Sequence, residues 1–127
     1  MSLADGTVAT RLPTQDLERA RRFYADKLGL EPAEERPGGL LYRCGGREFA
    51  LYASTGAAPG TFTQMGWSVD DLDATMAELK SRGLEFAEEY GVDVQVEGNY
   101  PSKGGRGERA VWFRDSEGNL LGIGQPL

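Results

Sequence analysis

The sequence contains no histidine, only one cysteine and no long hydrophobic run. Without histidine the chain lacks the commonest general base and metal ligand of proteins, and a Cys–His catalytic pair is excluded. Cys44 has no second cysteine to pair with, and its place in an expected strand predicts a small buried hydrophobic residue rather than a nucleophile. No stretch approaches the roughly 20 apolar residues of a membrane-spanning helix, so we expect no membrane partner.

Basic residues are also scarce, with 14 Lys and Arg against 20 Asp and Glu, a formal charge of −6. Nucleic-acid binding depends on an excess of basic side chains, so we expect no nucleic-acid partner. The negative charge would suit a cationic ligand, but the preferred interpretation is that it serves solubility. The N-terminus lacks the basic-then-apolar pattern of a secretion signal, and we therefore expect a cytoplasmic protein.

Two segments about 55 residues apart share one pattern: an extended stretch, an Asp-Leu pair, a helical stretch and a Gly-Leu pair. The pairs are Asp16-Leu17 and Gly29-Leu30 in the first segment, and Asp71-Leu72 and Gly83-Leu84 in the second. A pattern repeated at half the chain length predicts two similar modules with one shared core. We expect a single domain over residues 1–127, with half-modules at about 6–54 and 61–127.

Local patterns predict most of the elements. Apolar residues at helical spacing predict a helix over 17–28 that ends at Gly29, and a second helix after Asp70 or Asp71. The expected strands are 8–12, 40–44, 48–53, 63–69, 109–114 and 119–125. The segment 92–108 is polar and rich in glycine, which predicts either a functional lid or disorder.

Alternate residues of a strand face opposite sides of a sheet, so the strands have one side toward the helices and one toward a cup. Val8, Leu12 and Trp67 should face the helices, whereas Tyr42 lies in a strand without clear alternation and stays undecided. The cup-facing candidates for ligand binding are Arg11, Glu48, Tyr52, Gln64, Trp112 and Arg114. Tyr52 and Trp112 would form an aromatic wall, with a dimer or sheet contact as the alternative role for Trp112.

Three motifs together resemble the vicinal-oxygen-chelate superfamily of glyoxalase, bleomycin-resistance and extradiol dioxygenase proteins. They are Asp16–Ala20 with Phe23-Tyr24, Val69–Leu72, and Phe113–Asn119. The resemblance covers essentially the whole chain and implies an α+β fold, in which two βαβββ modules form an incomplete eight-stranded barrel or cup with the helices outside. It also implies, by analogy, a homodimer in which each cup is completed by the partner.

The resemblance further implies four metal ligands, one on each of four strands, at the positions of Ala9, Ala50, Gln64 and Gly122. Three of these residues carry no donor atom, and Gln64 offers only a neutral amide oxygen. One amide does not hold a divalent ion, even with Glu48 nearby. We therefore predict no metal and no other cofactor, and we exclude a metal-dependent glyoxalase, dioxygenase or thiol transferase.

Two functions stay open at this point, besides a structural role as a partner-binding subunit. The first is a metal-independent binding protein that holds a small organic ligand in an aromatic-walled cup, as the resemblance to drug-sequestering members implies. The alternative is a metal-free lyase or isomerase that uses Glu48, Tyr52 or Tyr100 as acid or base, although nothing pairs these residues at a recognisable spacing.

Overall fold

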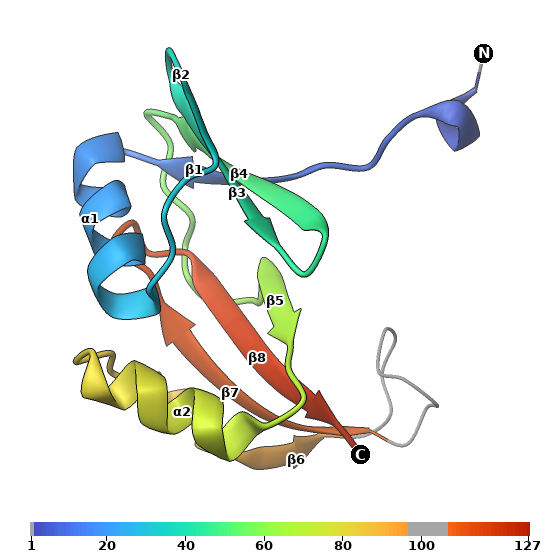
Figure 1. Ribbon diagram of the computed structural model, residues 1–127, viewed down its shortest axis with the longest axis vertical. Helices are drawn as coiled ribbons and strands as arrows, with labels where there is room; N and C mark the ends of the chain where they lie inside the picture. The colour runs from blue at the N-terminus through green and yellow to red at the C-terminus, as the bar shows by residue number, and fades with distance from the viewer. Residues whose placement is uncertain (1, 97–106) are drawn as a thin grey trace.

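The computed structural model describes residues 2–96 and 107–127, which form two modules of the same topology (Figure 1). The first module consists of β1 (Thr10–Thr14), α1 (Leu17–Leu28), β2 (Glu34–Arg36), β3 (Gly39–Cys44) and β4 (Arg47–Ala53). The second consists of β5 (Met65–Ser68), α2 (Leu72–Ser81), β6 (Val94–Val96), β7 (Glu108–Arg114) and β8 (Leu120–Pro126). Two short 3-10 helices, η1 (Leu3–Asp5) and η2 (Glu88–Tyr90), complete the described elements.

Each module builds its own mixed sheet of four strands. The strand order is β1-β4-β3-β2 in the first sheet and β5-β8-β7-β6 in the second. The first strand of each module runs parallel to the last, and the other pairs are antiparallel. The two sheets do not close into a barrel, and both helices lie on the same side of them in Figure 1. The predicted α+β fold of two βαβββ modules is confirmed.

The two helices begin in the same way because each Asp-Leu pair supplies the same cap. The carboxylate of Asp16 accepts a hydrogen bond from the Arg19 amide at 3.0 Å, and that of Asp71 accepts one from the Ala74 amide at 3.0 Å. These bonds satisfy amides that lack a partner within the first helical turn. At the end of α1, Gly29 has φ 71°, the left-handed conformation predicted for it. Neither described helix has the length and apolar character that a membrane crossing requires.

The helix-facing side chains of both sheets meet in one core. A chain of aromatic contacts crosses from the first module to the second. Tyr42 stacks on Phe49 with ring centroids 5.1 Å apart, Phe49 meets the edge of Trp67 at 5.8 Å, and Trp67 stacks on Phe113 at 6.0 Å. Trp67 therefore faces the core as predicted, and Tyr42, only 1% exposed, does so too.

Three expectations need correction or stay untested. Val8 is 95% exposed rather than buried, because β1 begins only at Thr10 and the segment before it projects from the body (Figure 1). The segment 92–108 contains β6 and the first residue of β7, so it is not wholly irregular. Whether it forms a lid is untested, because residues 97–106, with Tyr100 among them, lie outside the described residues.

Candidate functional site

Each sheet has a face turned away from the helices, which we call the first and the second cup face. On the first cup face the described residues form an open recess of about 920 Å³. It is lined by Ala9 and Arg11 at the start of the chain and by Glu48, Ala50 and Tyr52 of β4. The parallel pairing of β1 with β4 places Arg11 beside Ala50. Strand alternation thus brings three of the predicted binding residues onto one surface.

Charge on the first cup face is partly neutralised within the sheet. Glu48 accepts a hydrogen bond from Arg43, its cross-strand neighbour on β3, at 2.8 Å. This pair is exposed, so it contributes little to stability and leaves the face polar. Tyr52 is 39% exposed, and its main-chain carbonyl accepts a bond from the buried Thr14 hydroxyl at 3.0 Å. The phenol ring is therefore available to a ligand while its backbone is fixed.

The second cup face has a floor of glycines with larger side chains lying across it. The Trp112 indole covers Gly122, and its Nε1 lies 3.2 Å from the position that a Cβ at Gly122 would take. The same nitrogen donates a hydrogen bond to the Thr63 hydroxyl at 3.0 Å. The carboxyl carbon of Glu108 lies 2.6 Å from the Cβ position of Gly124. Any larger residue at either glycine would displace the side chain above it.

A residue of η2, Tyr90, lies beside Trp112 and enlarges its aromatic surface. The Tyr90 ring lies 6.2 Å from the Trp112 ring at an interplanar angle of 49°, and the Arg114 guanidinium lies 5.6 Å from the Tyr90 centroid. Arg114 also donates to the Gly60 carbonyl at 2.8 Å and to Glu89 at 2.9 Å. The hydrogen bond from Arg114 lowers the pKa of Glu89, and the same bond raises the pKa of Arg114. Both groups stay charged at neutral pH.

Gln64 is engaged at both ends of its amide. Its Nε2 donates to the Asn119 side chain at 3.0 Å, and its Oε1 accepts from the Leu120 amide at 3.3 Å. These bonds tie the chain before β5 to the start of β8. Ala9, Ala50 and Gly122 carry no donor atom, and the described residues contain no group of three His, Cys, Asp or Glu placed to hold a metal. The residues at the four implied positions do not fit a metal ion.

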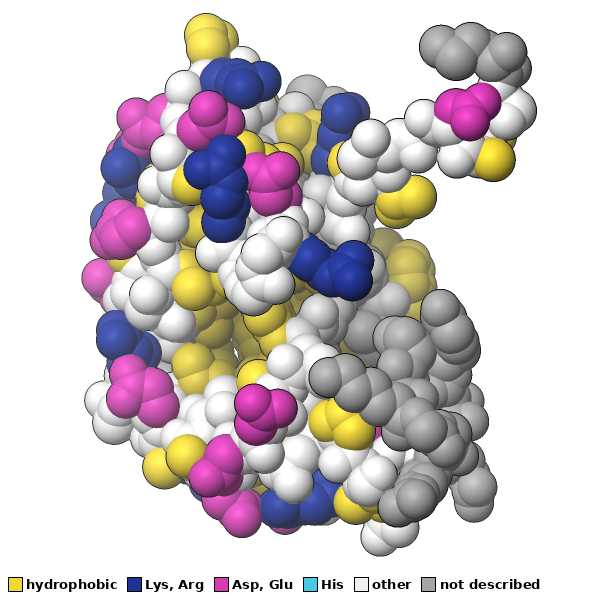
Figure 2. All heavy atoms as spheres, turned by 45° about the vertical axis from the view of Figure 1, so that its right-hand side comes forward, with side chains coloured by type: hydrophobic (Ala, Val, Ile, Leu, Met, Phe, Trp, Pro, Cys, Tyr) yellow, Lys and Arg dark blue, Asp and Glu magenta, His cyan; other side chains and the backbone are white. Residues whose placement is uncertain are grey.

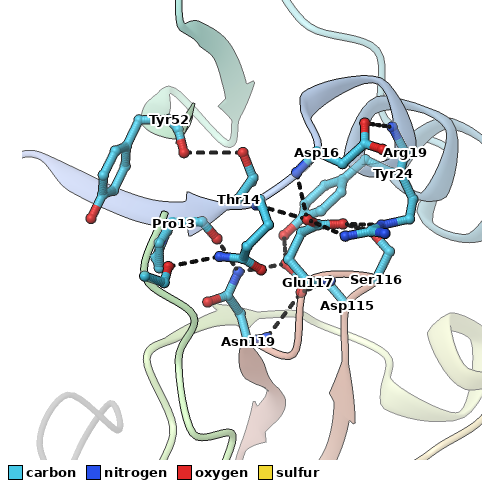
Figure 3. Close-up of polar contacts among 12 residues, drawn as sticks. Pro13, Thr14, Asp16, Arg19, Tyr24, Tyr52, Asp115, Ser116, Glu117 and Asn119 are labelled. Carbon is cyan, nitrogen blue, oxygen red and sulfur yellow. Dashed lines mark hydrogen bonds and ion pairs between the residues drawn. The ribbon is translucent and has the colours of Figure 1, made fainter. Parts of the chain in front are cut away.

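Beside the cup faces, the turn Asp115–Asn119, which we call the polar turn, joins β7 to β8 and contacts the start of α1 (Figure 3). Glu117 has a fully buried side chain that accepts bonds from the Gln15 and Asp16 amides at 2.9 and 3.0 Å and from Arg19 at 2.8 Å. The Tyr24 hydroxyl donates to Asp115 at 2.7 Å. Asn119 donates to the Pro13 carbonyl at 3.0 Å, which joins this network to Gln64.

The six predicted binding residues thus lie in separate places on the described chain. The recess of the first cup face brings together Arg11, Glu48 and Tyr52. Trp112 lies on the second cup face, and Gln64 is hydrogen-bonded to Asn119 in the network of the polar turn. Arg114 lines another recess, of about 1210 Å³, between α1, α2 and the η2 segment. Tyr90 and Glu108 were missed by the sequence analysis.

Comparisons with known proteins agree with this geometry. The sequence profile of the Glyoxalase/Bleomycin resistance protein/Dioxygenase superfamily matches residues 6–123. A glyoxalase/bleomycin resistance protein/dioxygenase structure from Alicyclobacillus acidocaldarius is 19% identical, with a TM-score of 0.75, over 100% of this chain and 96% of that one. No curated protein matches the chain.

Two further solved structures belong to proteins linked with antibiotics. TnmS3, an antibiotic binding protein from a Streptomyces species, is 25% identical over 99% of this chain and 100% of its own, with a TM-score of 0.67. A fosfomycin resistance protein from Listeria monocytogenes, solved with Mn(II), is 13% identical over 97% of this chain and 91% of its own, with a TM-score of 0.67.

Proposed function

Because the chain belongs to the glyoxalase, bleomycin resistance and dioxygenase superfamily, we propose that it is a metal-independent binding protein that holds a small organic ligand in an aromatic-walled cup. A cytoplasmic location and the absence of nucleic-acid and membrane partners are part of the proposal. The antibiotic binding protein TnmS3, which aligns with 99% of the chain, supports binding rather than chemistry.

One observation carries the proposal. The position that corresponds to the fourth metal ligand is Gly122, and the Trp112 indole lies within 3.2 Å of where its Cβ would be. A metal-binding side chain at this position would require the indole to move. The Trp112 ring therefore occupies the space that a metal ligand would need. A flat indole above glycine offers stacking to a planar ligand. Tyr90 beside it extends the aromatic surface, and Tyr52 supplies a further aromatic ring on the first cup face.

We further propose that the cup is completed by a second copy of the chain. The recess of the first cup face is lined by its own module alone, and Trp112 lies on the other module. A small-molecule site encloses most of its ligand, which one open sheet does not do. In a symmetric homodimer the first cup face of one protomer would meet the second cup face of the other, so that Tyr52 and Trp112 face each other across two chains.

Thermal denaturation tests the binding proposal. The purified protein is heated with divalent metals alone and with planar aromatic compounds that are neutral, cationic or anionic. A ligand at a hundred times its Kd adds about 2.7 kcal/mol of stability, a rise of roughly 10 °C in Tm. We expect such a rise with an organic compound, lost in Trp112→Ala and kept in Leu3→Ala, which truncates a side chain that is 98% exposed. Stabilisation by a metal alone would overturn the proposal.

Mixed dimers test where the site lies. Tyr52→Ala and Trp112→Ala chains, each defective alone, are coexpressed with different tags and the mixed dimer is isolated. If the cup spans two chains, one of the two cups in the mixed dimer has both aromatic residues intact and binding returns to half of the sites. If one chain holds the whole cup, the mixed dimer stays defective. A protein that sediments as a monomer while binding the compound would reject the shared cup directly.

The same compounds separate binding from the alternative of a metal-free lyase or isomerase. In that alternative Glu48, Tyr52 or Tyr100 would carry the proton. Glu48 is already paired with Arg43 on an exposed surface, which makes it a weak candidate for a catalytic base. Recovering the bound compound unchanged after long incubation supports the binding protein, and its conversion by the wild type but not by Glu48→Gln or Tyr52→Phe supports the enzyme.

A further inference from the structure

A second recess lies on the helix side of the molecule, where the two modules meet. Its volume is about 170 Å³, and its wall includes Leu28, Leu30, Cys44, Trp67, Leu79 and Ile123. We call it the apolar recess. Figure 2 shows hydrophobic side chains exposed between the upper and lower halves of the molecule. Trp67 and Ile123 alternate with Gly66 and Gly122 along β5 and β8, so this recess and the second cup face lie on opposite sides of one sheet.

The wall of the apolar recess offers almost no hydrogen bonds. Thr75 lines it, but the Thr75 hydroxyl donates to the Asp71 carbonyl at 2.8 Å and is therefore satisfied within α2. The other polar side-chain groups of the lining residues are the Cys44 thiol, a weak donor and acceptor, and the Trp67 indole N–H, a donor only. A bound water needs two to four polar partners, so water is held poorly here. Replacement of this water by an uncharged apolar molecule is therefore favourable in free energy.

The aromatic part of the wall is fixed in place. Trp67 stacks on Phe113 at an interplanar angle of 18° and meets Phe49 at 88°. Phe113 and Phe49 are 1% and 5% exposed and belong to the core. Trp67 cannot swing into the recess without breaking both contacts, so the space stays open rather than collapsing.

Size then selects the ligand. Sites for drug-sized ligands measure roughly 300–1,000 Å³, well above this recess, whereas an engineered apolar cavity of about 150 Å³ in another protein binds benzene. We propose that the apolar recess is a second binding site, separate from the cup, that takes an uncharged apolar molecule of one six-membered ring. The site does not depend on the proposed function of the cup.

Fluorobenzene is the probe. With the full chain we expect a saturable shift or broadening of its ¹⁹F resonance. Fluorobenzene should also slow the alkylation of Cys44 by iodoacetamide, because the thiol lines the recess. Val69, half-buried in the same wall, gives the filling variant. Val69→Phe should weaken binding by about tenfold or more, since the larger side chain takes the ligand's space. Leu3→Phe adds the same ring at a 98% exposed position and should leave binding unchanged.

Three results would overturn the second site. One is a ¹⁹F signal that does not saturate, and another is Cys44 alkylation that fluorobenzene leaves unchanged. The third is a Val69→Phe variant, shown by circular dichroism to be folded, that binds fluorobenzene as the wild type does. If a second copy covers the recess instead, Val69→Phe lowers the sedimenting mass and the wild type binds no fluorobenzene. Cys44 protection needs no variant, so the proposal stays testable if Val69→Phe fails to fold.

Discussion

Each module ends in a hairpin, β3–β4 in the first and β7–β8 in the second, and the two hairpin turns are built differently. The first turn consists of Gly45 and Gly46, with φ 56° and 77°, both exposed. These angles suit the tight two-residue turn that matches the twist of paired strands. The second is the polar turn Asp115–Asn119, most of which is buried. Equal topology therefore does not imply equal contacts.

The difference shows what each turn does beyond connecting two strands. The glycine turn meets only the local need of the hairpin, since no described atom beyond the adjacent residues lies within 4 Å of a Cβ at either glycine. The polar turn spans the two modules: Glu117 accepts bonds from the chain before α1, and Asp115 accepts one from Tyr24 within α1. The polar turn therefore adds buried polar contacts between the modules to those of the shared core, and both hold the two cup faces in place.

Removing the Glu117 carboxylate is expected to have the largest effect. Glu117→Gln keeps the shape but weakens the bonds to Arg19 and to two backbone amides, and charge-assisted bonds are roughly twice as strong as neutral ones. We expect a loss of about 2–3 kcal/mol in the free energy of unfolding, measured by urea denaturation. Glu48→Gln, in the exposed pair next to the glycine turn, should lose no more than about 0.5 kcal/mol. Equal losses of unfolding free energy in the two variants would contradict the claim that the polar turn stabilises the fold more than the glycine turn.

Lowering the pH should remove the difference in free energy of unfolding between the wild type and Glu117→Gln. Hydrogen bonds from Arg19 lower the pKa of Glu117 from its ordinary 4.5 to about 2. Because the folded-state pKa lies below the unfolded one, the carboxylate stabilises the native state above pH 4.5 and loses this effect as the pH falls toward 2. Urea denaturation of the wild type and Glu117→Gln over this range should show their free energies of unfolding converge. If the difference in free energy of unfolding stayed unchanged near pH 2, the stabilisation would not come from the charge of the Glu117 carboxylate.

Two buried tyrosines of the first module differ in whether their hydroxyl contacts the polar turn. Tyr24 donates to Asp115 at 2.7 Å, whereas the buried Tyr42 hydroxyl has no hydrogen-bond partner among the described residues. Burial raises the pKa of Tyr42 to about 12, so both hydroxyls are protonated at neutral pH. Tyr24→Phe should cost about 1–2 kcal/mol because it leaves a buried carboxylate short of a donor. Tyr42→Phe should be neutral or slightly stabilising. Thermal or urea denaturation of the two variants decides this, and the reverse order would contradict it.

Much of the fold could be predicted because its signals are local. The helix over 17–28, its cap at Asp16 and its end at Gly29 follow from residues within one or two turns of each other. The resemblance implied eight strands, but the residue patterns did not locate the two short ones, β2 and β6. β2 has the sequence Glu-Glu-Arg, without alternation, and it pairs with β3, while Glu35 forms an ion pair with Arg21 of α1. Val8 was assigned to the core because alternation continues past the residue at which β1 begins.

The candidate site was less predictable. Strand alternation predicts on which face of a sheet a residue lies, but not which residues from other elements lie next to it. It placed Arg11, Glu48 and Tyr52 on one surface. It could not show that Tyr90, outside any strand, lies beside Trp112. Nor could it show that both ends of the Gln64 amide are bonded to residues 119 and 120, over 50 positions further along the chain. The sequence motif around Asp115 contributed to the resemblance, but its role in joining the modules needed the structure.

The smallest effect is expected at the glycine turn itself. Asn-Gly is favoured in this type of turn, and Gly45→Asn has open space around it, so we expect a gain of about 0.5 kcal/mol from reduced freedom of the unfolded chain. Gly118→Asn is the matched change in the polar turn, at φ 86° with the Ala58 carbonyl 3.6 Å from its Cβ position. Because that turn also seats Glu117 against α1, any shift of its backbone disturbs the contact between modules. It should therefore gain nothing or lose stability in the same urea titration, and an equal gain at both glycines would mean that the polar turn tolerates movement as freely as the exposed one.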